Sequence, residues 1–432
     1  MLTFVLFWAY VLLTAGILFG LRQYRRASPI FYFPIILCMM ATGTFMIMDL
    51  NLEADRMYAA MLFVALASFG VSTLIASNTL SLSQSYARHA ARPVEESGQE
   101  EKQVAVAIFL MSVLITILYY RAIGYNVFLL MITGNLDEDY SNLRLATYSE
   151  GDYFAPGYVN QFKNVLLPLT AMACSVWLYR SRHRAAFYAF ASGSVAFTVW
   201  ALLGTGQRGY LIYTAASLVF GFFLFHIGRK SRIKPMYFAL AGVPVLLLFG
   251  FMTGAYTGAS DMGNGAVFSQ MIDRFTSIQQ ESGMFGFRYV YPLQTSWFYE
   301  WWENVVGILP SSEGSTLAHE VHEAYYGSFR GTAPLSSTGS AYYNGGVVAV
   351  ILLFGAMGWA YTYLYKRFLD GRKTMLRAVA YGFLFFYLSM YVSDAPTILL
   401  DNGVVAVVIF LLIIKIRVRR RGAPPTRMAV RR

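Results

Sequence analysis

LTFVLFWAYVLLTAGILFGL (2–21), followed by RQYRR (22–26), shows the pattern that decides the fold of this 432-residue chain. The first stretch carries no charged side chain, and the second carries three arginines. About 20 apolar residues in an α-helix are enough to cross the hydrocarbon core of a bilayer. The run starts at Leu2 with no basic segment before it and no clear small-residue cleavage site after it. We therefore interpret it as a membrane helix and not as a signal peptide.

The same alternation of long apolar runs and short polar segments continues along the chain. Hydrophobic residues make up 57% of the sequence and charged residues 13%, and the mean hydropathy is +0.48. A soluble protein of this length needs more charge to cover its surface. The pattern predicts an all-α polytopic membrane protein with about eleven transmembrane helices, at 2–21, 29–49, 57–78, 103–120, 161–179, 186–205, 209–227, 236–256, 343–364, 376–393 and 397–416.

Positive charge divides unevenly between the two sides that these spans define. Of the 34 Lys and Arg residues, 26 fall in the segments 22–26, 88–102, 180–184, 229–234, 366–377 and 415–432. Because basic loops stay in the cytoplasm, the C-terminus is expected inside and the N-terminus outside. The 26 basic and 5 acidic residues inside give +21, and the 8 basic and 18 acidic residues outside give −10. Basic loops facing anionic lipid explain this pattern, so no nucleic-acid partner is expected.

Two outer segments are long. The first covers about 121–160, and the second, 257–342, is the only piece as large as a soluble domain. Its stretch YVYPLQTSWFYEWWENVVGILP (289–310) is dense in Trp and Tyr at near-helical spacing, so we expect it to lie along the membrane interface. The chain is therefore divided into helices one to eight (1–256), the large loop (257–342), helices nine to eleven (343–416) and a basic tail (417–432).

Four outer arginines are candidates for binding a phosphorylated ligand. Arg208 lies in TGQRG (205–209), where the flanking glycines let a ligand approach closely, and Arg274, Arg288 and Arg330 lie in the large loop. Together they could neutralise a diphosphate through forked hydrogen bonds. The alternatives are that Arg208 snorkels to the interface, that Arg274 forms a surface ion pair, and that Arg288 and Arg330 pair with carboxylates of the loop.

Four side chains of the large loop are candidate proton acceptors: Glu281, His319, Glu320 and His322. His319 is placed first because imidazole titrates near neutral pH and could pair with a neighbouring glutamate. The string AHEVHEAYY differs from the zinc motif H-E-x-x-H, and no third ligand is evident, so no metal is expected. An exposed polar turn is the alternative interpretation.

The remaining motifs favour no other chemistry. Asp137-Glu138-Asp139 contains D-x-D but is interpreted as a solvated loop. Asp394 and Asp401 border hydrocarbon, so each is expected to pair with an arginine or to face a watery cavity. The two cysteines lie in apolar runs and give neither a metal-ligand spacing nor a disulfide framework. No P-loop or G-x-G-x-x-G is present, so no nucleotide cofactor is expected.

With the TGQRG arginine, the DRF segment at 273–275 and SSTGSAYYNGGVVAVILLFGAMG (336–358), the chain resembles the Wzy-type O-antigen and exopolysaccharide polymerases over about residues 120–403. That family has a GT-C-like membrane fold with one large periplasmic loop. In this family an acidic residue often follows the Ser-x-x-Gly before the helix. This chain has Ser340-Ala341 there, so a carboxylate role at that place is not expected.

The resemblance implies a metal-independent glycosyltransferase of the bacterial inner membrane with a periplasmic active site. It would transfer a growing glycan from undecaprenyl diphosphate to a new lipid-linked repeat unit, with loss of the lipid diphosphate. Arg208, Arg274 and Arg288 match the outer arginines of the family, which are expected to recognise the diphosphate. A chain-length regulator and a flippase of the same pathway are the implied partners.

Two alternatives remain open at this point. An O-antigen ligase shares the fold and the donor but uses a lipid A-core acceptor. A flippase for lipid-linked oligosaccharides belongs to a different class, and alternating access would require charges inside the spans and two related halves. The spans are nearly free of charge away from their ends, and the large loop has no counterpart in the first half. These two features favour the transferase.

Overall fold

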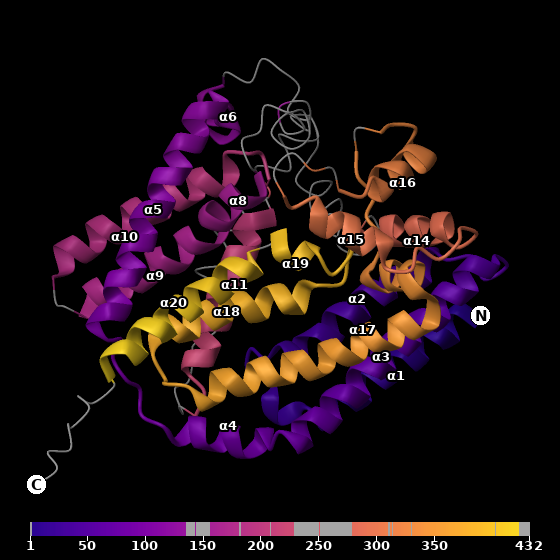
Figure 1. Ribbon diagram of the computed structural model, residues 1–432, viewed down its shortest axis with the longest axis horizontal. Coiled ribbons are helices and arrows are strands. Elements are labelled where there is room, and N and C mark those ends of the chain that lie inside the picture. The colour runs from indigo at the N-terminus through magenta and orange to yellow at the C-terminus, as the bar shows by residue number, and fades with distance from the viewer. Residues whose placement is uncertain are drawn as a thin grey trace, which may run out of the picture.

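The computed structural model describes residues 2–134, 143, 156–180, 183–207, 209–228, 250, 279–309, 312, 314–329, 331–401 and 403–422. Across these residues the elements are helices (Figure 1), and the one β-type contact is an isolated bridge between Ser336 and Ser393. The expected all-α polytopic class is confirmed.

Seven membrane spans of the described chain are long and apolar enough to cross a bilayer. They are α1 (Leu2–Gly20), α2 (Pro29–Ile47), α3 (Glu53–Thr79), α5 (Gln99–Ile123), the continuous run of α8 (Pro156–Asn160), the π-helical η2 (Gln161–Leu166) and α9 (Leu167–Arg180), α10 (Arg184–Leu203) and α17 (Ser337–Asp370). Three shorter apolar helices are α11 (Gly209–Phe225), α18 (Met375–Met390) and α20 (Val404–Gly422), apolar as far as Ile416. Ten of the eleven expected spans thus coincide with helices, and the span expected at 236–256 lies, apart from residue 250, outside the described residues.

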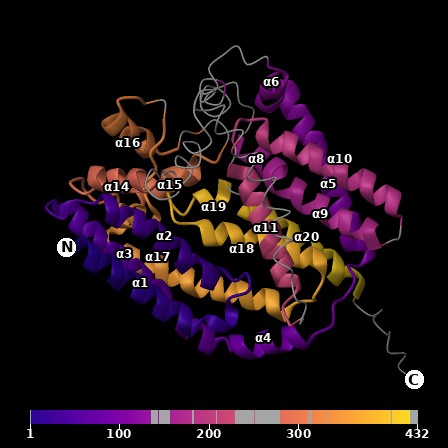
Figure 2. The same cartoon turned by 180° about the vertical axis from the view of Figure 1, so that it is seen from behind.

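Short helices cover the two ends of this bundle. They are η1 (Arg22–Tyr24), α4 (Leu82–Ala91), α6 (Val127–Thr133), α14 (Gln279–Val290), α15 (Tyr299–Val306), α16 (Leu317–Tyr326) and α19 (Ile398–Asp401). Figures 1 and 2 place α14, α15 and α16 at the end where the N-terminus lies, and α4 near the other end.

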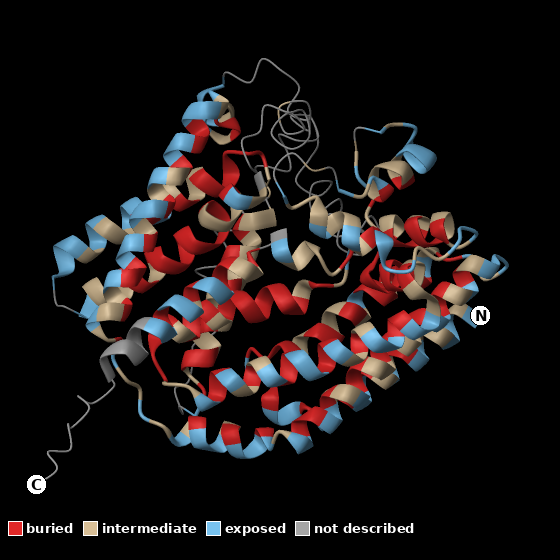
Figure 3. Cartoon of the chain, viewed as in Figure 1, coloured by how far each residue is buried: buried red, intermediate tan, exposed pale blue. Residues whose placement is uncertain are grey.

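Close backbone contacts hold the spans together. A Cβ on Gly382 of α18 would lie 2.4 Å from the backbone nitrogen of Gly221 in α11, and one on Gly358 of α17 would lie 2.6 Å from the carbonyl oxygen of Phe69 in α3. Small residues at such crossings are typical of helix packing in membranes. Large apolar side chains such as Leu12 and Val348 are exposed, as expected where helices meet lipid. Exposed and half-buried residues lie along the outward faces of the helices (Figure 3).

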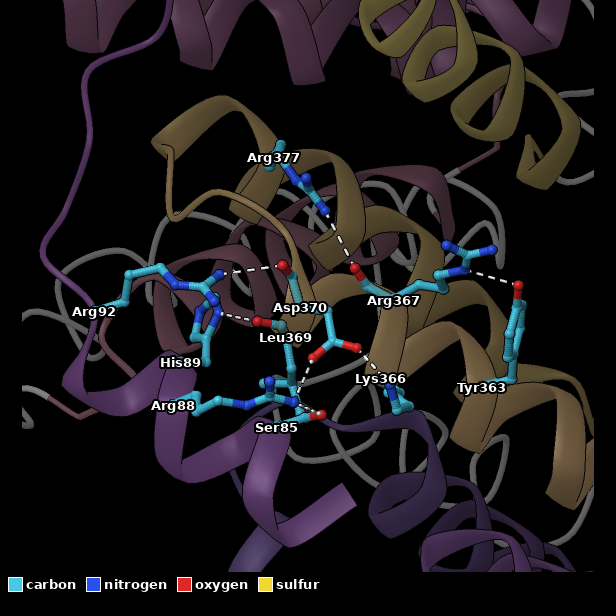
Figure 4. A network of polar contacts seen from close by, with 10 residues as sticks. All are labelled: Ser85, Arg88, His89, Arg92, Tyr363, Lys366, Arg367, Leu369, Asp370 and Arg377. Atoms are coloured by element: carbon cyan, nitrogen blue, oxygen red, sulfur yellow. Dashed lines mark hydrogen bonds and ion pairs between the residues drawn. The ribbon is translucent and has the colours of Figure 1, made fainter. Parts of the chain in front are cut away.

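Three segments expected on the cytoplasmic side, 22–26, 88–102 and 366–377, meet beside the C-terminal end of α11 at one end of the bundle, which we call the basic end. Arg26 donates to the carbonyl oxygen of His226 at 3.2 Å, and Arg372 pairs with Glu95 at 2.6 Å. A network of the same end joins α4 to the end of α17, where Asp370 accepts from Lys366 and Arg88 (Figure 4).

The opposite end, which we call the acidic end, is formed by α14, α15 and α16 with the starts of α3, α8 and α17. Tyr291 of α14 donates to Glu53 at 2.9 Å, and Tyr158 of α8 donates to the carbonyl oxygen of Ile308 at 2.9 Å. Tyr58 of α3 donates to Ser336 at 2.7 Å, immediately before α17. These bonds fix the loop helices onto the membrane bundle.

Helix α17 begins at Ser337, earlier than the expected start at 343. Ser336 caps it by accepting from the backbone N–H of Gly339 at 3.0 Å. The helix is then interrupted at Gly345 and Gly346, which have non-helical torsion angles. Gly346 has φ 63° and ψ −155°, a region that is open essentially only to glycine.

Candidate functional site

A buried carboxylate lies at the acidic end, where α15 packs against the first turns of α17. Glu300 is 7% exposed, and its carboxylate accepts hydrogen bonds from the side-chain amides of Asn344, at 2.7 Å, and Asn304. Asn304 is one turn away on the same helix, whereas Asn344 comes from α17. Two amide donors satisfy the lone pairs that would otherwise be buried without a partner.

The interruption of α17 puts Asn344 in place. A helix that breaks leaves carbonyl groups without their usual donors. Here the carbonyl oxygens of Tyr343 and Asn344 accept from the backbone N–H groups of Ser296, at 2.9 Å, and Phe298, at 3.0 Å. The Ser296 hydroxyl also donates to the Asn344 side-chain oxygen at 2.8 Å, which turns the amide nitrogen toward Glu300.

Burial raises the pKa of the Glu300 carboxyl to about 7. The Asn344 hydrogen bond opposes this rise, and the nearby Asp394 carboxylate adds to it through like-charge repulsion. Asp394 is itself fixed, because its backbone N–H donates to Leu335 at 2.6 Å and its carboxylate accepts from Ala395 at 2.7 Å. A carboxyl group with a pKa near 7 can take and return a proton at neutral pH.

Aromatic residues flank Glu300 in the sequence. Trp301 donates from its indole N–H to the Ser340 hydroxyl at 2.9 Å, so α15 is tied to α17 on both sides of Glu300. Trp297 is 76% exposed, and Trp302 is 63% exposed. Exposed rings of this kind suit either the membrane interface or stacking against sugar rings.

The turn that presents Trp297 is strained. Trp297 and Phe298 both have positive φ, 51° and 69°, which non-glycine residues rarely adopt. The Phe298 ring packs close to Gly345, where an added Cβ would lie 3.3 Å from the ring. Two adjacent bulky residues in this region persist only where the surroundings hold them. The hydrogen bonds to Tyr343 and Asn344 are part of that restraint.

Arg288 forms a forked ion pair with Asp55. The two contacts are 2.7 Å and 2.6 Å, and the Asp55 side chain is fully buried while that of Arg288 is 22% exposed. The Asp55 carboxylate raises the pKa of Arg288 further. Asp55 also accepts from the backbone N–H of Asp49 at 2.7 Å. The pair locks α14 onto the α2–α3 connection. Arg288 is therefore ion-paired, but its partner belongs to α3 and is not a carboxylate of the large loop as the alternative expected.

The two histidines of α16 bind carbonyl groups of the segment that follows the helix. Nδ1 of His319 lies 2.9 Å from the carbonyl oxygen of Gly331, and Nδ1 of His322 contacts that of Ser328. A carbonyl oxygen only accepts, so each Nδ1 carries a proton and donates it. The Nε2 of His322 faces Gly331, where an added Cβ would lie 2.1 Å away.

Glu320 and Glu281 complete the expected set of proton acceptors. Glu320 accepts from the hydroxyl of Thr316 at 2.6 Å and from that of Tyr289 at 3.4 Å. Glu281 is in the first turn of α14 and is partly buried. Neither residue belongs to the hydrogen-bond cluster of Glu300. Arg208, Arg274 and Arg330 lie outside the described residues.

The sequence pattern does not single out Glu300 as a candidate proton acceptor, because SWFYEWWEN (296–304) is typical of an aromatic segment at the membrane interface. A signal was nevertheless present. The argument applied to Asp394, that a carboxylate bordering hydrocarbon is costly, applies equally to a glutamate between aromatic rings. What the sequence did not indicate was its partner, because Asn344 is 44 residues away.

No family model, curated protein or solved structure matches this chain.

Proposed function

We propose that this protein is a polymerase of undecaprenyl-diphosphate-linked oligosaccharide repeat units at the periplasmic face of the bacterial inner membrane. The observation that carries the proposal is the buried Glu300 carboxyl, whose pKa is raised to about 7 at the acidic end of a membrane bundle. A glycosyl transfer from a lipid diphosphate needs one proton acceptor beside the membrane surface. Glu300 meets that requirement better than the residues expected from the sequence.

In the proposed reaction, a hydroxyl of the incoming lipid-linked unit attacks the anomeric carbon of the growing glycan. A C–O bond forms there as the C–O bond to the diphosphate breaks, and that electron pair leaves with the lipid diphosphate. The hydroxyl proton passes to the Glu300 carboxylate. Asn344 and Asn304 hold that carboxylate in place, and burial keeps it basic enough to accept the proton.

The leaving diphosphate needs positive charge. In this proposal Arg208 and Arg274 supply it by forked hydrogen bonds, which stabilise the charge that develops in the transition state. We expect Arg208→Ala or Arg274→Ala to abolish polymer without lowering protein abundance. Lysine at either position should rescue poorly because it lacks the fork. Wild-type polymer from Arg208→Ala would reduce this residue to an interfacial anchor.

The aromatic residues around Glu300 support a carbohydrate substrate. Trp297 and Trp302 lie three and two residues from Glu300 in the sequence and are exposed, and such flat apolar rings can stack on the carbon–hydrogen face of a sugar ring. Ser340 holds Trp301 at the position where the polymerases that this chain resembles often have a carboxylate. In our proposal Glu300, from α15, supplies the carboxylate next to that position.

Purified protein in lipid nanodiscs, incubated with synthetic lipid-linked repeat units, tests the proposal. A polymerase produces a ladder of products that differ by one repeat unit. A ligase produces no ladder and instead modifies lipid A-core, and a flippase only changes the leaflet of an intact substrate. We expect the ladder to persist with a chelator, and its loss on chelation with recovery by magnesium would overturn the metal-independent reaction.

A further inference from the structure

The span that contains η2 holds a buried lysine. Lys163 is 0% exposed, and within the described chain its ammonium group has no hydrogen-bond partner and no ion pair. The neighbouring Asn164 is 1% exposed, and both polar atoms of its amide also lack a hydrogen-bond partner among the described residues. Burying such groups unsatisfied is costly, so charged residues inside spans are retained mainly where they have a function.

The local helix geometry singles out the same position. Residues 161–166 form the π-helical η2 between the α-helical α8 and α9. Insertions of this kind are rare and frequently occur at functional sites. Lys163 comes seven residues after Pro156, so it lies about 10 Å along the helix from the acidic end. In a span that crosses a hydrocarbon core of about 30 Å, Lys163 therefore lies in the third nearer the acidic end.

Aromatic rings form the wall around the ammonium group. Its nitrogen lies 5.5 Å from the ring centre of Tyr119 and 5.8 Å from that of Tyr120, both in α5. The Tyr120 hydroxyl donates to the carbonyl oxygen of Ala201 at 2.7 Å, in the last turn of α10. Position 204, immediately before the TGQRG segment (205–209), packs against Tyr120, one of the two rings near the Lys163 ammonium group.

A second buried lysine shows what a structural lysine looks like in this protein. Lys373 is 3% exposed at the basic end. Its ammonium group donates to the carbonyl oxygens of Ile227, at 2.6 Å, and His89, at 3.3 Å. These carbonyls lie at the ends of α11 and α4, where a cation is favoured. Among the residues that the structure describes, Lys163 has no comparable set of acceptors.

We propose that Lys163, with Asn164 beside it, forms an anion site for the phosphate group of a lipid. An ammonium group binds phosphate as a point charge, and its flexible stem lets it move toward a ligand at the membrane surface. The carrier diphosphate and a phospholipid headgroup share this chemistry. The site does not require transferase activity, because a ligase or a flippase would need the same contact.

Three probes and two matched variants test the site. Thermal unfolding of the full chain in a phosphate-free detergent, dodecyl maltoside, is followed with undecaprenyl diphosphate, phosphatidylglycerol or inorganic diphosphate. Lys163→Met should unfold at the same or a higher temperature than wild type without ligand, because it removes an unsatisfied charge. Lys373→Met should unfold at a lower temperature, because it removes satisfied contacts.

With ligand, the wild type and Lys373→Met should be stabilised, and Lys163→Met should bind the active probe roughly tenfold to hundredfold more weakly. If undecaprenyl diphosphate stabilises the protein, the ligand of the site is the lipid carrier. If phosphatidylglycerol does so, the ligand is a phospholipid headgroup, and if inorganic diphosphate does so, it is a free anion. Equal affinity in wild type and Lys163→Met would overturn the proposal, as would no response to any probe. So would a Lys163→Met protein as unstable as Lys373→Met. None of these outcomes depends on whether Glu300 is the base.

Discussion

At the scale of single residues, Glu300 combines two properties that oppose each other. Its burial stabilises the protonated form, and its hydrogen bonds from Asn344 and Asn304 stabilise the carboxylate. Burial wins, and the carboxyl is left near the midpoint of its titration at neutral pH. The cost of that arrangement appears in the stability of the protein, which makes it measurable without substrate.

Thermal unfolding against pH should reveal this cost. The pKa of Glu300 is raised from 4.5 to about 7 in the folded state, so its contribution to stability is full below about pH 4.5 and is lost as pH rises through about 7. A pKa shift of one unit corresponds to about 1.4 kcal/mol, so the free energy of unfolding falls by roughly 3 kcal/mol over this pH range. Glu300→Gln should remove this part of the pH dependence, and Glu303→Gln on the same helix should retain it. Identical profiles for wild type and Glu300→Gln would contradict the assignment.

The Arg288–Asp55 pair makes a different prediction. Removing one partner of a buried pair leaves the other charge unpaired, which costs about 3–5 kcal/mol. Arg288→Met and Asp55→Leu should therefore each destabilise the protein strongly, and the double variant should recover much of the loss. Unfolding temperatures of the four proteins measure the coupling. If Arg288→Met abolished activity without lowering the unfolding temperature, Arg288 would act on the ligand and not on the fold.

At the scale of elements, the interruption of α17 connects the helix to the site. Gly346→Ala should destabilise the protein by about 1–3 kcal/mol, because its backbone conformation is disfavoured for any residue with a side chain. It should also reduce activity, since Asn344 depends on the break. Gly355→Ala is the matched control, because position 355 lies in the helical part of α17 with open space around its Cβ. Equal effects of the two substitutions would show that the break does not position the site.

Hydropathy predicted the membrane helices because an apolar segment inside a bilayer must form its backbone hydrogen bonds within itself, as a helix does. It did not predict the start of α17, since SSTGSAYYN is polar enough to suggest a loop. Those residues are helical and mostly buried because α14 and α15 cover them. The candidate site also depends on tertiary contacts. His319 and His322 were visible from their residue types, whereas Glu300 depends on a tertiary contact with Asn344 that no local pattern shows.

At the scale of the whole molecule, the basic and acidic ends separate charge along the bundle. Glu320 and Arg25 lie at opposite ends, and the positive-inside rule predicts that position 320 faces the periplasm. Cys38 and Cys174 are first replaced by alanine, and Glu320→Cys and Arg25→Cys are introduced separately. An impermeant thiol reagent added to intact spheroplasts should label the cysteine at 320 and not the one at 25. The reverse pattern would contradict both the orientation and a periplasmic reaction.

The most direct measurement of the central claim compares the rate of repeat-unit addition by the wild type, Glu300→Gln and Glu303→Gln in nanodiscs. A general base contributes about 10²–10⁴-fold, so Glu300→Gln should lose at least about 100-fold in turnover. Glu303→Gln, which changes a carboxylate three residues away, should stay within a few-fold of the wild type. The wild-type rate should rise with pH through about 7, as the Glu300 carboxyl loses its proton. Full turnover by Glu300→Gln with the same pH profile as the wild type would show that the base lies elsewhere.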